Sequence, residues 1–278
     1  MIENFLPTLP LWLIGLVLIF VCVLAFEAGR LVRQRMARRL GFDGTIISDA
    51  EGYIIGAIFS LFAFMIAITY SIALERFDER WNLVVEEATS VSRLFLRAEL
   101  LDEPMQTQLR STLRDYARTR IAPHGVWNEN IAAQLKRSHQ LRQKLLDEAR
   151  AAALPYRDSD LGSDLIEGMN DLLTVGTRRE LAGAAHIPSR ILNAMLLYLI
   201  VAAASLGYIS TDRTKGLRVA STLLFALFAM AIILILDLDR PRSGSIEVPQ
   251  TALVNLVATL DKVQLHPRPP AHPDQPAD

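Results

Sequence analysis

The feature that most constrains this chain is an uninterrupted helical stretch, Gly52–Leu101, whose two halves need different surroundings. The first half, Gly52–Leu74, is apolar over about the 20 residues that a bilayer crossing requires. No glycine or proline separates it from the heavily charged second half, Glu75–Leu101. At about 1.5 Å per residue, one continuous helix would extend about 75 Å. The sequence therefore predicts a helix that begins in a membrane and ends in an aqueous domain, which suits a channel, transporter or sensor.

The charged half carries a repeating apolar pattern. Its apolar residues follow one another in alternating steps of four and three along the chain: Phe77, Trp81, Val84, Ala88, Val91, Phe95 and Ala98. Such steps place side chains along one side of a helix. The pattern predicts that this half packs against other helices in water.

Composition indicates a membrane protein. Hydrophobic residues make up 51% of the chain, and the mean hydropathy is +0.26, which soluble domains rarely reach. The net charge is −1, whereas a nucleic-acid partner would require a strong basic excess. The single cysteine, Cys22, lies within an apolar run and cannot form an internal disulfide.

Four apolar runs are long enough to span a bilayer, and they form one pair towards each end of the chain. They are Leu9–Gly29, Gly52–Leu74, Arg190–Ile209 and Val219–Leu236. The first run is interpreted as a retained helix rather than a signal peptide, because no basic segment precedes it and arginines follow it. The predicted fold is all-α, with four transmembrane helices in two pairs and a central helical aqueous domain.

The predicted domain boundaries follow from these runs and from the prolines. They are residues 1–74 for the first transmembrane pair, 75–188 for the aqueous domain, 189–240 for the second pair, 241–264 for a short amphipathic helix and 265–278 for a disordered, proline-rich tail. Within the aqueous domain, Asp102 is the expected N-cap of a helix that ends before Pro123. Further helices are expected at Trp127–Ala153 and Asp160–His186.

The stretch that follows the second apolar run resembles a known family. Phe77, Asp78, Arg80 and Trp81, the turn Leu236–Val248 and the two-plus-two arrangement of spans resemble the bacterial bestrophin-like membrane proteins. That family is in turn distantly similar to the bestrophin anion channels, in which a similar segment follows the second transmembrane helix.

The resemblance implies a multi-pass protein of the bacterial inner membrane. It also implies a homo-oligomer, a pentamer by analogy, whose second helices line a pore, with the central domain in the cytoplasm. Arginines in the short connections Arg30–Asp49 and Ser210–Arg218 predict the opposite orientation by the positive-inside rule. Both orientations stay open, and the first is preferred because large domains often override loop charge.

Small residues recur at helical spacing in the second apolar run: Gly56, Ser60, Ala63, Ala67 and Ser71. They predict either a slim pore-lining face or close packing of helices. Under the first interpretation the pore-lining candidates are Ile58, Ser60, Phe62, Ala63 and Ile66, with the bulky members as a hydrophobic constriction. No charged residue lies within 53–74, which argues against proton or sodium coupling.

Charged residues gather at the predicted membrane boundary, and these are Arg76, Asp78, Arg80, Asp237, Asp239 and Arg240. The arginines could concentrate anions at a pore mouth, or reach towards head groups while the carboxylates pair with them. A pair between Asp237 and either Arg76 or Arg80 is geometrically allowed, because an even number of crossings separates them.

The sequence offers little sign of catalysis. Asp158, Asp160 and Asp164 fail the calcium-loop pattern, and the histidines lack metal-ligand spacing. Neither a P-loop nor a dinucleotide fingerprint occurs. We therefore expect no enzyme, cofactor, metal or nucleic-acid partner. The expected function is passive conduction of chloride or another small anion through an axial pore. The alternative is a non-conducting membrane scaffold or sensor that binds a partner through its helical domain.

Overall fold

The computed structural model describes residues 10–41, 49–121, 129–210, 215–240 and 244–265. Its elements are α1 (Leu11–Leu40), α2 (Asp49–Ala98), α3 (Met105–Arg120), α4 (Glu129–Ala153), the short 3-10 helix η1 (Leu154–Tyr156), α5 (Asp160–Ala184), α6 (Ser189–Ile209), α7 (Lys215–Asp239) and α8 (Thr251–Leu265). No strand occurs in these ranges, and the predicted all-helical class is confirmed. Helix α2 runs without a break past Glu75, as its sequence predicts.

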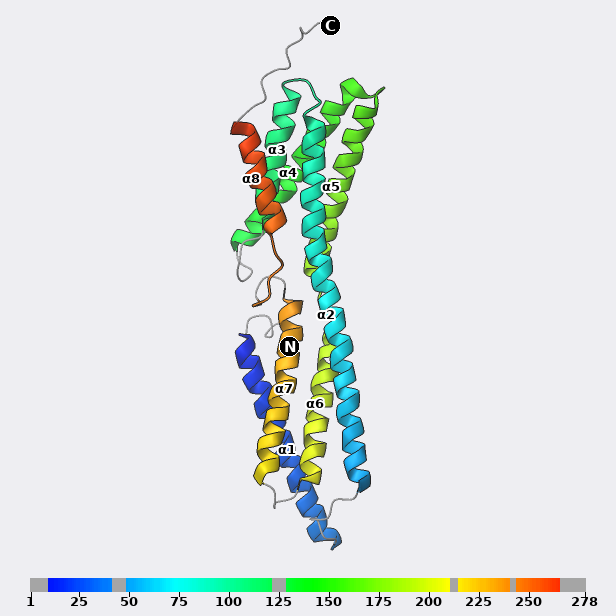
Figure 1. Ribbon diagram of the computed structural model, residues 1–278, viewed down its shortest axis with the longest axis vertical. Helices are drawn as coiled ribbons and strands as arrows, with labels where there is room; N and C mark the ends of the chain where they lie inside the picture. Colours follow the sequence, from blue (N-terminus) through cyan, green and yellow to red (C-terminus); the bar gives the residue numbers. More distant parts are fainter. Residues whose placement is uncertain (1–9, 42–48, 122–128, 211–214, 241–243, 266–278) are drawn as a thin grey trace, which may run out of the picture. The chain divides into compact units, whose positions relative to one another are not determined.

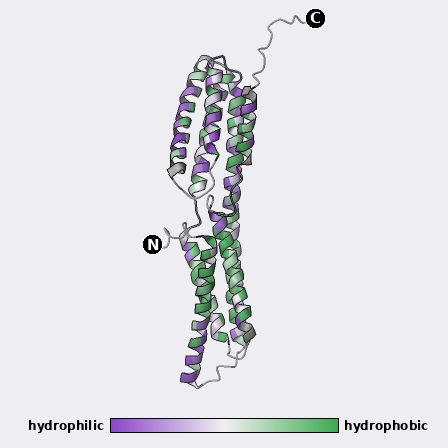
Figure 2. Cartoon of the chain, turned by 90° about the vertical axis from the view of Figure 1, so that its left-hand side faces the viewer, coloured by the Kyte–Doolittle hydropathy of each residue, from purple (hydrophilic) through white to green (hydrophobic). Residues whose placement is uncertain are grey.

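The chain divides into two compact units. Unit 1 comprises Met1–Asp78 and Ala185–Glu247, and unit 2 comprises Glu79–Ala184 and Val248–Asp278. Four helical stretches are long and apolar enough to cross a membrane, in Leu11–Arg39, Ala50–Ala98, Asp160–Ile209 and Arg218–Asp239. Figure 2 shows hydrophobic residues along the helices of unit 1 and a mixture of hydrophobic and hydrophilic residues in unit 2.

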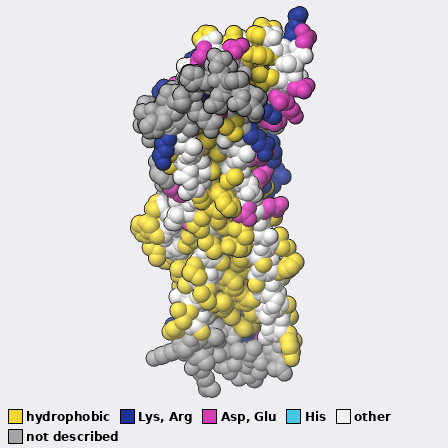
Figure 3. Space-filling model, turned by 45° about the horizontal axis from the view of Figure 1, so that its top comes forward, with side chains coloured by type: hydrophobic (Ala, Val, Ile, Leu, Met, Phe, Trp, Pro, Cys, Tyr) yellow, Lys and Arg dark blue, Asp and Glu magenta, His cyan; other side chains and the backbone are white. Residues whose placement is uncertain are grey.

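Unit 1 packs α1, α6, α7 and the apolar half of α2 around one hydrophobic core. Aromatic rings link these helices. Phe26 of α1 meets Phe225 of α7 edge to face at 6.2 Å between ring centroids, and Phe62 of α2 stacks on Tyr198 of α6 at 5.6 Å. Hydrophobic side chains cover much of the outer surface of this unit, as Figure 3 shows, which is the surface expected of helices that face lipid.

Helices α1 and α6 approach each other at two glycines. A Cβ atom built on Gly29 would lie 1.9 Å from the carbonyl oxygen of Ala204, and one on Gly207 would lie 1.9 Å from that of Phe26. The obstacles are backbone atoms, so they cannot turn away as a side chain could. Only glycine permits this close crossing.

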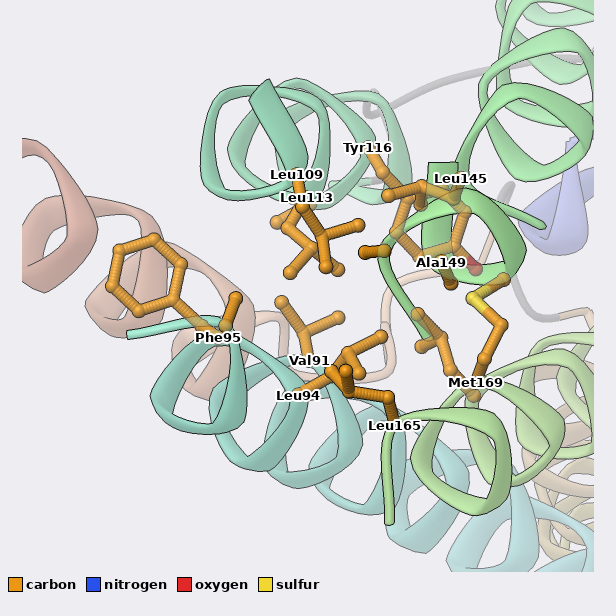
Figure 4. Close-up of a cluster of buried hydrophobic side chains, with 14 of the residues drawn as sticks. Val91, Leu94, Phe95, Leu109, Leu113, Tyr116, Leu145, Ala149, Leu165 and Met169 are labelled. Carbon is orange, nitrogen blue, oxygen red and sulfur yellow. The ribbon is translucent and has the colours of Figure 1, made fainter. Parts of the chain in front are cut away.

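Unit 2 packs the charged half of α2 with α3, α4, α5 and α8 side by side (Figure 1). Figure 4 shows the leucine-rich core that these helices share, with Leu113 of α3, Leu145 of α4 and Leu165 of α5 directed towards one another. The predicted apolar pattern of α2 is largely buried here. Val84, Ala88, Val91, Phe95 and Ala98 lie in cores, whereas Trp81 is 44% exposed.

Three local expectations need correction. Helix α1 continues to Leu40 and ends at Gly41, whose φ of 69° is left-handed, so the arginines after Gly29 lie on a helix. Asp102 does not cap α3. Pro104 occupies that position, and the Asp102 carboxylate accepts a hydrogen bond of 2.8 Å from the Tyr156 hydroxyl. Helix α5 ends at Ala184, before His186.

Two further expectations concern the C-terminal part. The segment 241–264, treated above as separate, contains α8, which packs on unit 2 through Leu253, Leu256 and Leu260. The expected disorder of the tail concerns residues 266–278, which lie outside the described ranges, as does Pro241.

The glycine crossing predicts that Gly207→Ala destabilises the protein by about 1–3 kcal/mol, because the added methyl group forces α1 and α6 apart. Gly183→Ala is the matched control. A Cβ atom there meets nothing within 4 Å, so this variant should be neutral or slightly stabilising. Thermal unfolding in detergent measures both, and equal midpoints would contradict the argument.

Candidate functional site

One side of the apolar half of α2 is exposed, as judged from the described residues. Gly56, Ser60, Ala63, Ala67 and Ser71 are all exposed, and a Cβ atom built on Gly56 would meet nothing within 4 Å. We refer to these five residues as the open face of α2. Its side chains are small and uncharged, and the large side chain of Phe64, which is 63% exposed, lies on the same side one turn after Ser60.

The residues predicted to line a pore do not all lie together. Ser60 and Ala63 belong to the open face. Phe62 is 0% exposed and packs inside unit 1 against Tyr198 and Phe228. Ile66 is partly buried and packs against the same core, and Ile58 is partly buried as well. The small and the bulky candidates therefore occupy different sides of α2, since successive residues of a helix point about 100° apart.

Two of the boundary residues in unit 1, Arg76 and Asp239, hold the segment that leads into α6. The Arg76 guanidinium donates a hydrogen bond of 3.1 Å to the carbonyl oxygen of His186. The buried Asp239 carboxylate accepts one of 2.9 Å from the backbone N–H of Ile187, just before α6. A negative charge at this place favours the positive end of the helix dipole.

The buried Asp237 carboxylate fixes the turn that follows α7. It accepts a hydrogen bond of 2.6 Å from the backbone N–H of Ser245, and Arg240 donates its N–H to the Asp237 carbonyl at 3.2 Å. A Cβ atom on Gly244 would lie 2.2 Å from the same carboxylate oxygen, so the chain can pass here only as glycine. This turn lies within Leu236–Val248, the segment that carries the family resemblance, and the Asp237 carboxylate stabilises its backbone conformation.

Arg80 and Asp78 are the other boundary residues of α2. Arg80 is buried in unit 2 and donates from Nε to the carbonyl oxygen of Ala182 at 3.1 Å, near the end of α5. Asp78 is exposed. The pair expected between Asp237 and Arg76 or Arg80 stays a prediction.

A buried network of charges in unit 2 escaped the sequence analysis. At its centre is Glu87 of α2, which is 0% exposed. Its carboxylate accepts hydrogen bonds of 2.6 Å from the Tyr116 hydroxyl, 2.6 Å from Arg120 and 2.5 Å from Arg179. Helices α2, α3 and α5 are thereby joined at one carboxylate.

A second carboxylate extends the network towards α4. Glu180 accepts a hydrogen bond from Arg120 at 2.8 Å and another from Arg142, and it lies 3.1 Å from Nε2 of His139. Arg179 also donates to the side-chain oxygen of Gln250 at 2.8 Å, just before α8. Helices α3, α4 and α5 therefore all contribute side chains to this network, and α8 begins directly after Gln250, which also contacts it.

The ionisation of the network follows from its geometry. Burial alone would raise the pKa of the Glu87 carboxyl, but the guanidinium groups of Arg120 and Arg179 and the Tyr116 hydroxyl together lower that pKa below its ordinary value. Burial and the Glu87 charge raise the pKa of the Tyr116 hydroxyl. Glu87 is thus an anion and Tyr116 is neutral. The three groups that contact the Glu87 carboxylate all donate hydrogen bonds to it.

The charged groups described above hold helices together and form no evident catalytic or metal-binding arrangement. In the part of the chain that the structure describes, no three His, Cys, Asp or Glu side chains are placed to hold a metal ion. The Glu87 network has its charges paired in the interior, where they specify how helices fit together. The open face of α2, by contrast, is exposed and available for a function.

Comparison with known proteins identifies the fold. The family model for the bestrophin-like domain matches residues 11–253. The chain belongs to the bestrophin-like family. A search of curated proteins gives no significant match for this bestrophin-like chain.

Solved structures agree on the fold of this bestrophin-like protein. One variant of a bacterial bestrophin homologue from Klebsiella pneumoniae is 14% identical with a TM-score of 0.63, and the alignment covers 91% of this chain and 98% of that one. Another variant of that homologue is 15% identical with a TM-score of 0.63, over 88% and 97% of the two chains. A crystal structure described as a membrane protein is 14% identical with a TM-score of 0.63, over 93% and 99%. The chain is therefore a membrane protein with the bestrophin fold.

The buried network predicts that Glu87→Gln lowers the free energy of unfolding by about 3–5 kcal/mol, because the buried guanidinium groups lose their counter-charge. Glu86→Gln on the same helix is the control. Glu86 is exposed and lies 3.5 Å from an exposed Arg178, so its loss should change stability by no more than about 0.5 kcal/mol. Denaturant unfolding in detergent compares the two, and similar losses would refute the special role of Glu87.

The lowered pKa of Glu87 also predicts an acid-dependent stability. Its contribution is fully present above the unfolded-state pKa of a glutamate, about 4.3, and is lost as pH falls through the lower folded-state pKa. Unfolding midpoints measured from pH 7 down to pH 3 should therefore drop below about pH 4.3. The drop should be smaller in Glu87→Gln, and an equal drop in both proteins would assign it to other groups.

Proposed function

We propose that the protein is one subunit of an oligomeric channel that conducts small anions passively across a bacterial inner membrane. The observation that carries this proposal is the open face of α2, whose five residues are small, uncharged and left exposed by the described part of the chain. Membership of the bestrophin-like family supports it. A pentamer with α2 around its axis is the assembly that the family resemblance favours.

In this proposal the open face lines the pore and Phe62 lies behind it. The stacked rings of Phe62 and Tyr198 fix the rotation of α2 about its own axis, so that Ser60 and Ala63 point away from the subunit. The narrowest passage is then set by how closely neighbouring α2 helices approach, and bulky side chains of the same subunit serve as support. This replaces the hydrophobic constriction that the sequence suggested for Ile58, Phe62 and Ile66.

The charge pattern of α2 favours an uncoupled pathway. Residues 53–74 contain no ionisable acid or base, apart from tyrosine, that could carry a proton or hold a sodium ion within the membrane. Arg76 follows at the end of this stretch and is half-buried. The exposed carboxylates of Glu75, Asp78 and Glu79 lie beside it in the sequence, so this charge alone gives no preference for anions, and that preference follows from the family resemblance.

The test is chloride flux into liposomes that contain the purified protein, after its oligomeric state has been measured. We expect flux above that of empty liposomes, and a loss of about tenfold or more in Ala63→Trp, because the indole fills the space in front of α2. The matched control is Ala220→Trp, at an exposed alanine of α7, which should keep the flux within about twofold of the wild type.

Three results would contradict the proposal. A monomer or dimer cannot form an axial pore, and a verified oligomer without flux would favour a non-conducting scaffold or sensor. Equal flux in the two tryptophan variants would place the pathway away from the open face.

A further inference from the structure

The C-terminal part of α1 is held to its neighbours by one arginine. Arg33 is 3% exposed, and its guanidinium donates a hydrogen bond of 3.0 Å to the Glu51 carboxylate at the start of α2. The same guanidinium lies 5.2 Å from the ring centroid of Tyr208, near the end of α6. Arg33 therefore fixes which side of α1 faces the rest of unit 1 and which side faces outwards.

The outward side carries arginines without counter-charges. Arg35, Arg38 and Arg39 are exposed, and none of them has an ion pair among the residues that the structure describes. Arg30, one turn earlier, differs because it pairs with Glu27 at 2.8 Å. Positive charges at this spacing repel one another, so a negative partner would stabilise them.

Apolar side chains are exposed on the same side. Leu31 is 44% exposed, Val32 47% and Met36 40%. We call these three residues together with Arg35, Arg38 and Arg39 the basic end of α1. The helix dipole accounts for cations in the last turn, Arg38 and Arg39, but it explains neither Arg35 nor the exposed apolar residues.

We propose that the basic end of α1 binds the phosphodiester head groups of anionic phospholipids. The site directly follows the apolar run Leu9–Gly29, so it lies where a bilayer places its head groups. Leu31, Val32 and Met36 contact the upper acyl chains, while the guanidinium groups bind phosphate in the two-pronged manner that arginine allows. A soluble anion would leave these apolar side chains uncovered.

A second helix reaches the same end of unit 1. Arg218, near the start of α7, is half exposed and lies 3.8 Å from Glu27, the carboxylate that also pairs with Arg30. Glu27 thus neutralises the inner arginines and ties α7 to α1. Arg35, Arg38 and Arg39 are therefore the arginines that can bind lipid. The inference concerns α1 and does not depend on whether the protein conducts ions.

The experiment measures lipid retention by the full-length protein in native mass spectrometry, after equilibration with mixed micelles of phosphatidylglycerol and phosphatidylcholine. We expect the wild type to retain phosphatidylglycerol preferentially and to lose this preference as salt rises. The triple variant R35Q/R38Q/R39Q should show a preference reduced by about tenfold or more, whereas R35K/R38K/R39K should keep only part of it, because lysine retains the charge but cannot bind phosphate in the two-pronged manner.

The control variant R93Q/R137Q/R150Q removes the same charge from exposed arginines of unit 2 and should bind lipid as the wild type does. The variant L31S/M36S, which keeps every arginine, should weaken lipid retention. Inorganic phosphate should compete poorly. The proposal fails if the two glutamine triples retain phosphatidylglycerol equally, or if phosphate competes as well as lipid and L31S/M36S has no effect.

Discussion

Both cores of this protein depend on the way one helix, α2, presents different sides to different neighbours. In unit 1 it contributes Phe62 to the aromatic packing with α6 and α7. In unit 2 it contributes Val91 and Leu94 to the leucine-rich core and Glu87 to the buried network. A helix that served only as a membrane anchor would not need the contacts that α2 makes in unit 2. Because the same helix supplies the open face, its rotation about its axis determines both the packing and the surface left for function.

The two kinds of burial around α2 act differently. Apolar packing stabilises each unit in proportion to the area it removes from water, and it tolerates many substitutions of similar volume. The network of Glu87 with Arg120 and Arg179 tolerates few, because any missing partner leaves a charge unpaired in the interior. Glu87 therefore specifies the register of α2 against α3 and α5, while the leucines supply most of the stabilisation.

Helix positions could be predicted from the sequence, because apolar periodicity and prolines are local signals. Gly41, by contrast, ends α1 eleven residues later than the apolar run suggests, since arginines continue a helix as well as leucines do. The partners of Glu87 could not be predicted, because they lie 29, 33 and 92 residues away. The position of Glu87 could have been recognised as buried, because it lies three residues after Val84 and four before Val91, in step with the apolar pattern of α2. The burial of Phe62 likewise could not be predicted from the sequence of α2 alone, because its partners Tyr198 and Phe228 belong to α6 and α7.

The central claim is that copies of this chain meet around the open face of α2. Single cysteines placed at Ala67 on that face and at Leu223 on the outer side of α7, each in a Cys22→Ser background, test it in native membranes with a short thiol-reactive cross-linker. We expect cross-linked dimers from the cysteine at position 67 and monomers from the one at position 223. Monomers from the cysteine at position 67 together with cross-linked dimers from the one at position 223 would mean that the open face is turned towards lipid, and would contradict the claim.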